Sequence, residues 1–176
     1  MARRALLSLV LVSIVVMFFS SCAYTLSLSG ASIPAGLKTI DIQYFENNAP
    51  LVVNTLSQQF TEALKNRIRT QTGISIVRGE GANATMSGTI TGYSIAPVSI
   101  EATNNNTAPI ANASRLTITV NVKYTYEADK KLSFEESFSK SKNFTGDIAA
   151  QEQALIQDIN KQLTDDIFNR AFANWN

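Results

Sequence analysis

Apolar and polar residues alternate along several segments of the chain, the period-two pattern of a β-strand with one buried face. The clearest segment is 115–126, RLTITVNVKYTY, in which every second residue from Leu116 onward is aliphatic or aromatic. The segment 132–144 continues the alternation after the turn sequence EADKK, so the two together predict a β-hairpin. The segment 37–45 places Ile40, Ile42 and Tyr44 on one side before ENNAP ends the strand.

Two other segments have the spacing of an amphipathic helix. From Asn54, which suits the N-cap position, apolar residues recur every four positions until Gly73 ends the helix. A second helix is predicted from residues 145–147 to near the end of the chain, with an apolar stripe along its length. The positions expected in the core are Ile40, Ile42, Phe60, Leu64, Ile118, Val120, Val122, Ile159 and Leu163.

Two more strands complete the predicted order of elements. They are ISIVR at 74–78 and ATMSGTITGYSIAPVSI at 84–100, the latter bent near Gly88 or Gly92. The order β-α-β-β-β-β-α predicts one α+β domain, a mixed four- to five-stranded sheet with two helices packed on one face. The first strand and the segment 74–78 should be parallel, because a helix connects them. Residues 101–114 lack an apolar period and predict a long loop, either functional or disordered.

The face of the sheet without helices is predicted to be polar, with scattered positive charge. Plain solvation of this face is the alternative to a binding role. The residues expected there are Thr117, Thr119, Asn121 and Lys123, together with Ser139 or Lys142.

The N-terminus has the layout of an export signal. Arg3 and Arg4 precede an apolar run that is shorter than the roughly 20 residues of a membrane-spanning helix. Ser20 and Ser21 then stand before Cys22, the only cysteine of the chain. A lone cysteine can be a small buried hydrophobe, but this position resembles a bacterial lipobox. We therefore predict a signal peptide at 1–21, a lipid on Cys22, a tether at 22–36 and a folded domain at 37–176.

Charge and composition exclude several classes of function. Removing residues 1–21 takes away two arginines and changes the formal net charge from +1 to −1, so nucleic acid is not an expected partner. The chain has no histidine, which excludes imidazole acid–base catalysis and histidine-ligated zinc. The neighbouring pairs Glu135–Glu136 and Asp165–Asp166 should point their carboxylates apart. No enzyme activity, cofactor or metal is predicted.

Several segments resemble a known family when taken together with Cys22. They are ASIPAGLKTIDIQYFENNAPLV, LSQQFTEALKNRI, SRLTITVNVKYTY, FEESFS and DDIFNRAFANW. Their pattern resembles the LptE family of lipopolysaccharide-assembly lipoproteins, in particular the branch with a YFxNNAP segment, here Tyr44 to Pro50. The resemblance implies an outer-membrane lipoprotein, anchored by its lipid and facing the periplasm. It also implies a non-enzymatic role as plug and partner of an LptD-type β-barrel, with which it places lipopolysaccharide in the outer leaflet.

A second class of function stays open at this point, a periplasm-facing lipoprotein that binds and regulates a cell-wall synthesis complex. For direct contact with lipopolysaccharide, cations near apolar surface are needed to bind its phosphates. The hairpin is expected to bring four candidates together on one side, with ordinary surface charge as the alternative. These candidates are Arg115, Lys123, Lys140 and Lys142.

Overall fold

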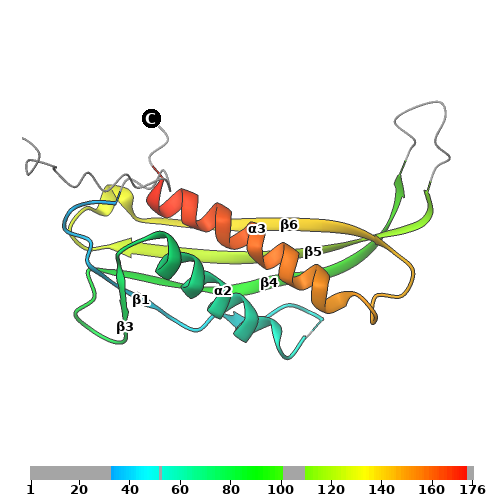
Figure 1. Cartoon of the computed structure of the whole chain (residues 1–176), viewed down its shortest axis with the longest axis horizontal. Coiled ribbons are helices and arrows are strands. Elements are labelled where there is room, and N and C mark those ends of the chain that lie inside the picture. The colour runs from blue at the N-terminus through cyan, green and yellow to red at the C-terminus, as the bar shows by residue number, and fades with distance from the viewer. Residues whose placement is uncertain (1–32, 52, 101–109, 174–176) are drawn as a thin grey trace, which may run out of the picture.

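The computed structural model describes residues 33–51, 53–100 and 110–173. The predicted signal peptide, Cys22 and most of the predicted loop at 101–114 lie outside these residues. Figure 1 shows one layer of two helices lying along a long sheet. The elements in chain order are β1 (Thr39–Ile42), β2 (Glu46–Asn47), α2 (Leu56–Gln71), β3 (Ser75–Val77), β4 (Ala84–Ile100), β5 (Ile110–Tyr126), η1 (Lys130–Leu132), β6 (Phe134–Thr145) and α3 (Glu152–Phe172).

The sheet has the strand order β3-β1-β4-β5-β6, and the two-residue strand β2 pairs with β4 beyond the end of β1. Strands β1 and β3 are parallel neighbours, which confirms the prediction from the helix between them. Strands β4, β5 and β6 form an antiparallel meander that includes the predicted hairpin. The sheet is therefore mixed, as predicted. It has six strands because β2 lies within the sequence ENNAP, which was predicted to be a turn.

Both helices bury their apolar stripe against the same face of the sheet. In α2 the four-residue repeat of Leu56, Phe60, Leu64 and Ile68 is fully buried. The predicted stripe of α3 is buried as well, and the two helices run side by side in the same direction (Figure 1). All nine predicted core residues are buried, each at most 5% exposed. They belong to one cluster that joins the helices to the sheet.

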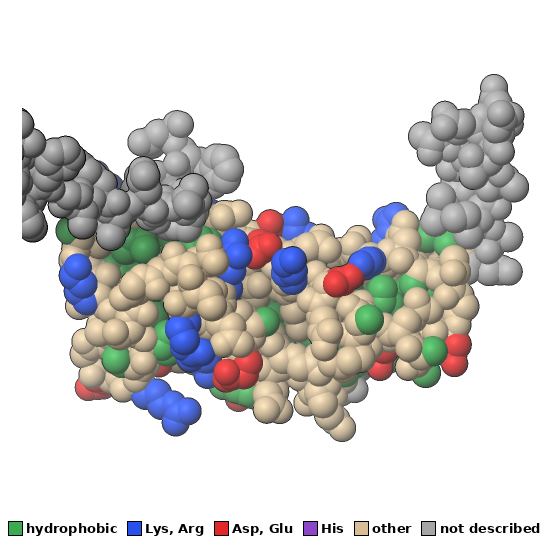
Figure 2. Space-filling view, in the orientation of Figure 1, with side chains coloured by type: hydrophobic (Ala, Val, Ile, Leu, Met, Phe, Trp, Pro, Cys, Tyr) green, Lys and Arg blue, Asp and Glu red, His purple; other side chains and the backbone are tan. Residues whose placement is uncertain are grey.

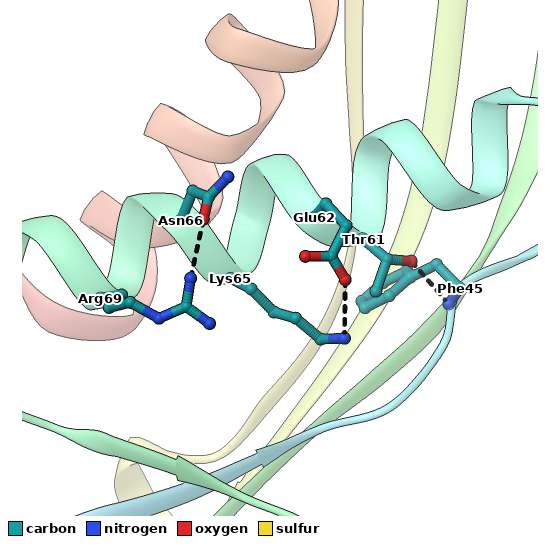
Figure 3. A network of polar contacts seen from close by, with 6 residues as sticks. All are labelled: Phe45, Thr61, Glu62, Lys65, Asn66 and Arg69. Carbon is teal, nitrogen blue, oxygen red and sulfur yellow. Dashed lines mark hydrogen bonds and ion pairs between the residues drawn. The ribbon is translucent and has the colours of Figure 1, made fainter.

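The YFENNAP segment is fixed to α2 through Phe45. The Phe45 ring is fully buried and meets the Phe60 ring edge-on, with centroids 5.1 Å apart. Its backbone N–H donates to the buried Thr61 Oγ1 at 3.1 Å (Figure 3). Further along, the Asn48 N–H donates to the Ile90 carbonyl of β4 at 2.8 Å. Helix α2 and strand β4 thus hold this segment from two sides.

Strand β4 is bent where the sequence predicted it. Its register with β5 shifts between Ile90 and Gly92, a β-bulge that changes which residues face the helices. After the bulge Tyr93 points to the helix side, and its hydroxyl donates to Glu152 Oε1 at 2.6 Å. This bond ties β4 to the first turn of α3. Burial, followed by the bond to Glu152 and its charge, raises the pKa of Tyr93 well above its usual value.

Three element boundaries differ from the predictions. Helix α2 begins at Leu56 with Thr55 at the N-cap, not Asn54, and the Thr55 side chain makes no capping bond. Strand β5 begins at Ile110, so part of the predicted loop is strand. Helix α3 begins only at Glu152, because Gly146 at φ +79° and a turn at residues 148–151 come first. Neither described helix combines the length and apolar character needed to cross a membrane.

Candidate binding surface

The face of the sheet that the helices leave uncovered carries an array of hydroxyl and amide side chains, which we call the open face. Directly opposite residues of neighbouring strands share a face, so the register defines rows across β4, β5 and β6. At the centre, Thr119 lies between Gly92 and Ser139, and its Oγ1 is 3.0 Å from Ser139 Oγ. The flanking rows are Ser94–Thr117–Ser141 and Thr89–Asn121–Ser137.

Two of the four predicted cations lie on the open face, at opposite ends of it. Arg115 lies across from Asn143, and its Nε donates to Asn143 Oδ1 at 2.9 Å. Lys123 lies across from Glu135 on one side and Ser87 on the other. Arg115 and Lys123 are eight positions apart on β5, a span of about 27 Å. Arg115 and Lys123 therefore cannot bind one phosphate together.

The other two predicted cations, Lys140 and Lys142, lie on the opposite face of the sheet, so the expected grouping of all four is wrong. In the register they stand across from the buried Ile118 and Leu116, on the side of the helices. Each forms an ion pair with α3. Lys140 Nζ lies 2.7 Å from Asp166 Oδ2, and Lys142 pairs with Asp158.

A third ion pair continues this line between β6 and α3. Arg170 lies 2.6 Å from Glu136 Oε1, and its guanidinium stacks 4.4 Å from the centre of the Phe134 ring. Strand β6 is at the edge of the sheet, so long side chains on its helix side extend past the core to the surface of α3. On the face seen in Figure 2, Lys and Arg side chains are interspersed with Asp and Glu.

The neighbouring carboxylates point apart, as predicted. Glu136 pairs with Arg170 on the helix side, while Glu135 lies across from Lys123 on the open face. On α3, Asp165 Oδ1 lies 3.1 Å from Arg67, and Asp166 pairs with Lys140. Each of these acids thus has its own cationic neighbour.

A groove of about 430 Å³ lies in the open face near Lys123. Its wall is Tyr44, whose side chain is 58% exposed. The alternation in the sequence placed Tyr44 on the same side of the strand as Ile40 and Ile42, and this expectation is wrong. Strand β1 ends at Ile42, and Phe45 enters the core instead. The groove is lined by Gln43, Tyr44, Glu46, Ser87, Gly88, Thr89, Asn121, Lys123 and Glu135.

A second, basic cleft of about 310 Å³ lies between α2 and the β1–β3 edge of the sheet. Lys65 and Arg69 point to it from successive turns of α2, and Arg78 follows β3. Glu62 accepts from Lys65 Nζ at 3.1 Å, and Arg69 donates to Asn66 Oδ1 at 2.8 Å (Figure 3). Sequence reasoning missed this cleft. The i, i+4 spacing of Lys65 and Arg69 was the available signal.

The fold is one found in bacterial lipoproteins. Uncharacterized lipoprotein B from Nitrosomonas europaea is 16% identical, with a TM-score of 0.51 over 84% of this chain and 88% of that chain. The rare lipoprotein B from Shewanella oneidensis is 12% identical, with a TM-score of 0.51 over 75% of this chain and 92% of that one. The hypothetical protein CT253 from Chlamydia trachomatis is 9% identical, with a TM-score of 0.52 over 78% and 99% of the two chains. At these identities the likeness concerns the fold alone.

The sequence itself matches a family model. Residues 37–171 match the model of LptE, described as lipopolysaccharide-assembly, and the chain belongs to this family. The resemblance inferred from the sequence is thereby confirmed. No curated protein is significantly similar in sequence. Membership indicates a role in lipopolysaccharide assembly and hence a place in the cell envelope.

Proposed function

We propose that this protein is a non-enzymatic outer-membrane lipoprotein that assists the insertion of lipopolysaccharide as plug and partner of an LptD-type β-barrel. The observation that carries the proposal is the open face. It is built on strands of 17, 17 and 12 residues, and no helix among the described residues covers it. Its hydroxyl and amide groups can exchange hydrogen bonds with a polar wall without burying unpaired charge.

The partner surface is tested by a bulky charge at the centre of the open face. Thr119→Arg places a guanidinium in the row of Gly92 and Ser139, where a closely apposed wall would leave it no room. We expect the barrel to be lost when the tagged chain is purified from detergent-solubilised outer membranes, with unchanged unfolding of the chain itself. Gln162→Arg, on the exposed side of α3, is the control and should retain the barrel. Equal recovery of the barrel with both variants would contradict the proposal.

The anchor in this proposal is a lipid on Cys22, which follows the apolar N-terminal run. Several acyl chains, at about 0.8 kcal/mol for each buried CH₂, attach a protein stably to a membrane. Cys22→Ser should leave an uncleaved precursor that does not reach the outer membrane. A free thiol on Cys22 in the native protein, seen by mass spectrometry, would remove this part of the proposal.

Direct contact with lipopolysaccharide is proposed at Arg115 and Lys123, the two predicted cations on the open face. Lys140 and Lys142 provide a matched pair, because they are engaged by α3 on the other face. Replacing Arg115 and Lys123 by Ser should weaken lipopolysaccharide binding, whereas the same change at Lys140 and Lys142 should not. An equal loss of lipopolysaccharide binding in both double variants would mean that overall positive charge, and not the open face, determines the binding.

A further inference from the structure

We propose that the groove beside Tyr44 is a saccharide-binding site, which recognises sugar rings and not phosphate. The inference rests on the proposed function only for the choice of the saccharide to be tested. It goes beyond the two cations discussed above, of which Lys123 also lines the groove, because it assigns the carbohydrate part of the ligand to a place built around an exposed aromatic ring.

Tyr44 is exposed on a rigid support. An exposed aromatic residue on a mobile loop would lose conformational entropy on binding a ligand. Here the next residue, Phe45, is fully buried against Phe60 and bonded to Thr61. Directly after Phe45, β2 begins at Glu46 and pairs with β4. On the other side of Tyr44, the Gln43 N–H donates to the Met86 carbonyl of β4 at 2.9 Å. The Tyr44 ring is therefore preorganised, and binding a ligand costs little conformational entropy.

The side chains that line the groove have the chemistry that a sugar ring requires. A sugar ring has apolar C–H faces and a rim of hydroxyls that both donate and accept hydrogen bonds. The Tyr44 ring offers an apolar face with negative π density, suited to the C–H face of a sugar. Around it, Gln43 and Asn121 offer amides, while Ser87 and Thr89 offer hydroxyls that can act either way.

The charged side chains of the groove favour a sugar over a phosphate. The groove contains one cation, Lys123, and two carboxylates, Glu46 and Glu135. A phosphate entering it would meet more negative than positive charge. Carboxylates instead accept strong hydrogen bonds from sugar hydroxyls. The volume of about 430 Å³ lies within the range of small-molecule sites.

The test uses the full chain in detergent and two probes obtained from the host's lipopolysaccharide by mild acid hydrolysis, the lipid-free oligosaccharide and lipid A. Titration calorimetry should show binding of the oligosaccharide. Tyr44→Ala should weaken that binding at least tenfold, while Tyr44→Trp should retain it. Leu51→Ala, at another exposed apolar residue of the same connection, is the control and should bind as the parent does.

Unfolding by urea separates a binding role from a structural one. Because Tyr44 is exposed, Tyr44→Ala should leave the midpoint unchanged. Unaltered oligosaccharide affinity in Tyr44→Ala would overturn the inference, and so would the absence of any oligosaccharide binding. Binding of lipid A alone would also overturn it while leaving the proposed function intact. The proposed function is tested separately, by whether the barrel is recovered with the tagged chain.

Discussion

Gly88 is the position at which a single methyl group should do most damage to this fold. A Cβ atom there would lie 2.0 Å from the Asn121 carbonyl oxygen and 2.6 Å from Phe45 Cε1. Carbon and oxygen atoms in contact are ordinarily at least about 3.3 Å apart. The overlap with the oxygen is therefore more than ~1 Å. That oxygen belongs to the backbone of β5, an interior strand of the sheet, so it cannot rotate away as a side chain would.

The loss of stability in Gly88→Ala can be estimated from these contacts. Overpacking a core costs about 1–3 kcal/mol, and a clash with both backbone and a buried ring belongs at the upper end. Replacing a strand glycine by alanine returns about 0.5–1 kcal/mol of conformational entropy. We therefore expect Gly88→Ala to lower the free energy of unfolding by about 2 kcal/mol.

Urea unfolding followed by circular dichroism measures this change. With a slope of about 2 kcal/mol per molar urea, the midpoint should fall by roughly 1 M. Gly73→Ala is the matched control, because a Cβ at Gly73 meets nothing within 4 Å. The control should stay within about 0.5 kcal/mol of the parent or gain slightly. If Gly88→Ala were as stable as Gly73→Ala, the close approach of β4, β5 and Phe45 described above would be refuted.

Two further predictions concern the core. Leu163→Ala removes a fully buried side chain of α3 and should cost about 2–5 kcal/mol in urea unfolding; a change below 1 kcal/mol would show that α3 does not pack as described. Burial raises the pKa of Tyr124 to about 12, with a smaller contribution from Tyr126, so the folded state keeps the phenol protonated when the unfolded chain ionises near pH 10. The stability that the protonated Tyr124 contributes should therefore be fully present below about pH 10 and fall as the pH rises toward 12. In thermal scans, Tyr124→Phe should make this fall in stability shallower. An unchanged pH profile in Tyr124→Phe would contradict the prediction.

The core of the fold could be predicted from the sequence because its elements are half-buried. On β5, Ile118, Val120 and Val122 alternate with polar residues, and both spacing and burial agree. The same logic found the stripe of α2. Strand β2 could not be found in this way, since two residues are too few for a period.

The candidate surfaces were harder to predict because they depend on partners distant in sequence. Lys140 and Lys142 occupy alternating positions that point toward the helices, yet charge argued for the solvent side. Only the carboxylates of α3 explain how cations lie there. Tyr44 followed the alternation of β1 on paper, but the strand had already ended and Phe45 filled the core. Where a strand stops is decided by its neighbours, here β4, and not by its own pattern.

We propose above that the protein works as a partner of an outer-membrane β-barrel in lipopolysaccharide assembly. The most direct measurement is to purify the lipidated chain, tagged at its C-terminus and expressed at native level, from detergent-solubilised outer membranes, and to identify what accompanies it in stoichiometric amount. We expect an LptD-type β-barrel together with lipopolysaccharide. Recovery of an inner-membrane cell-wall synthase in place of the barrel, or of the chain alone, would contradict it.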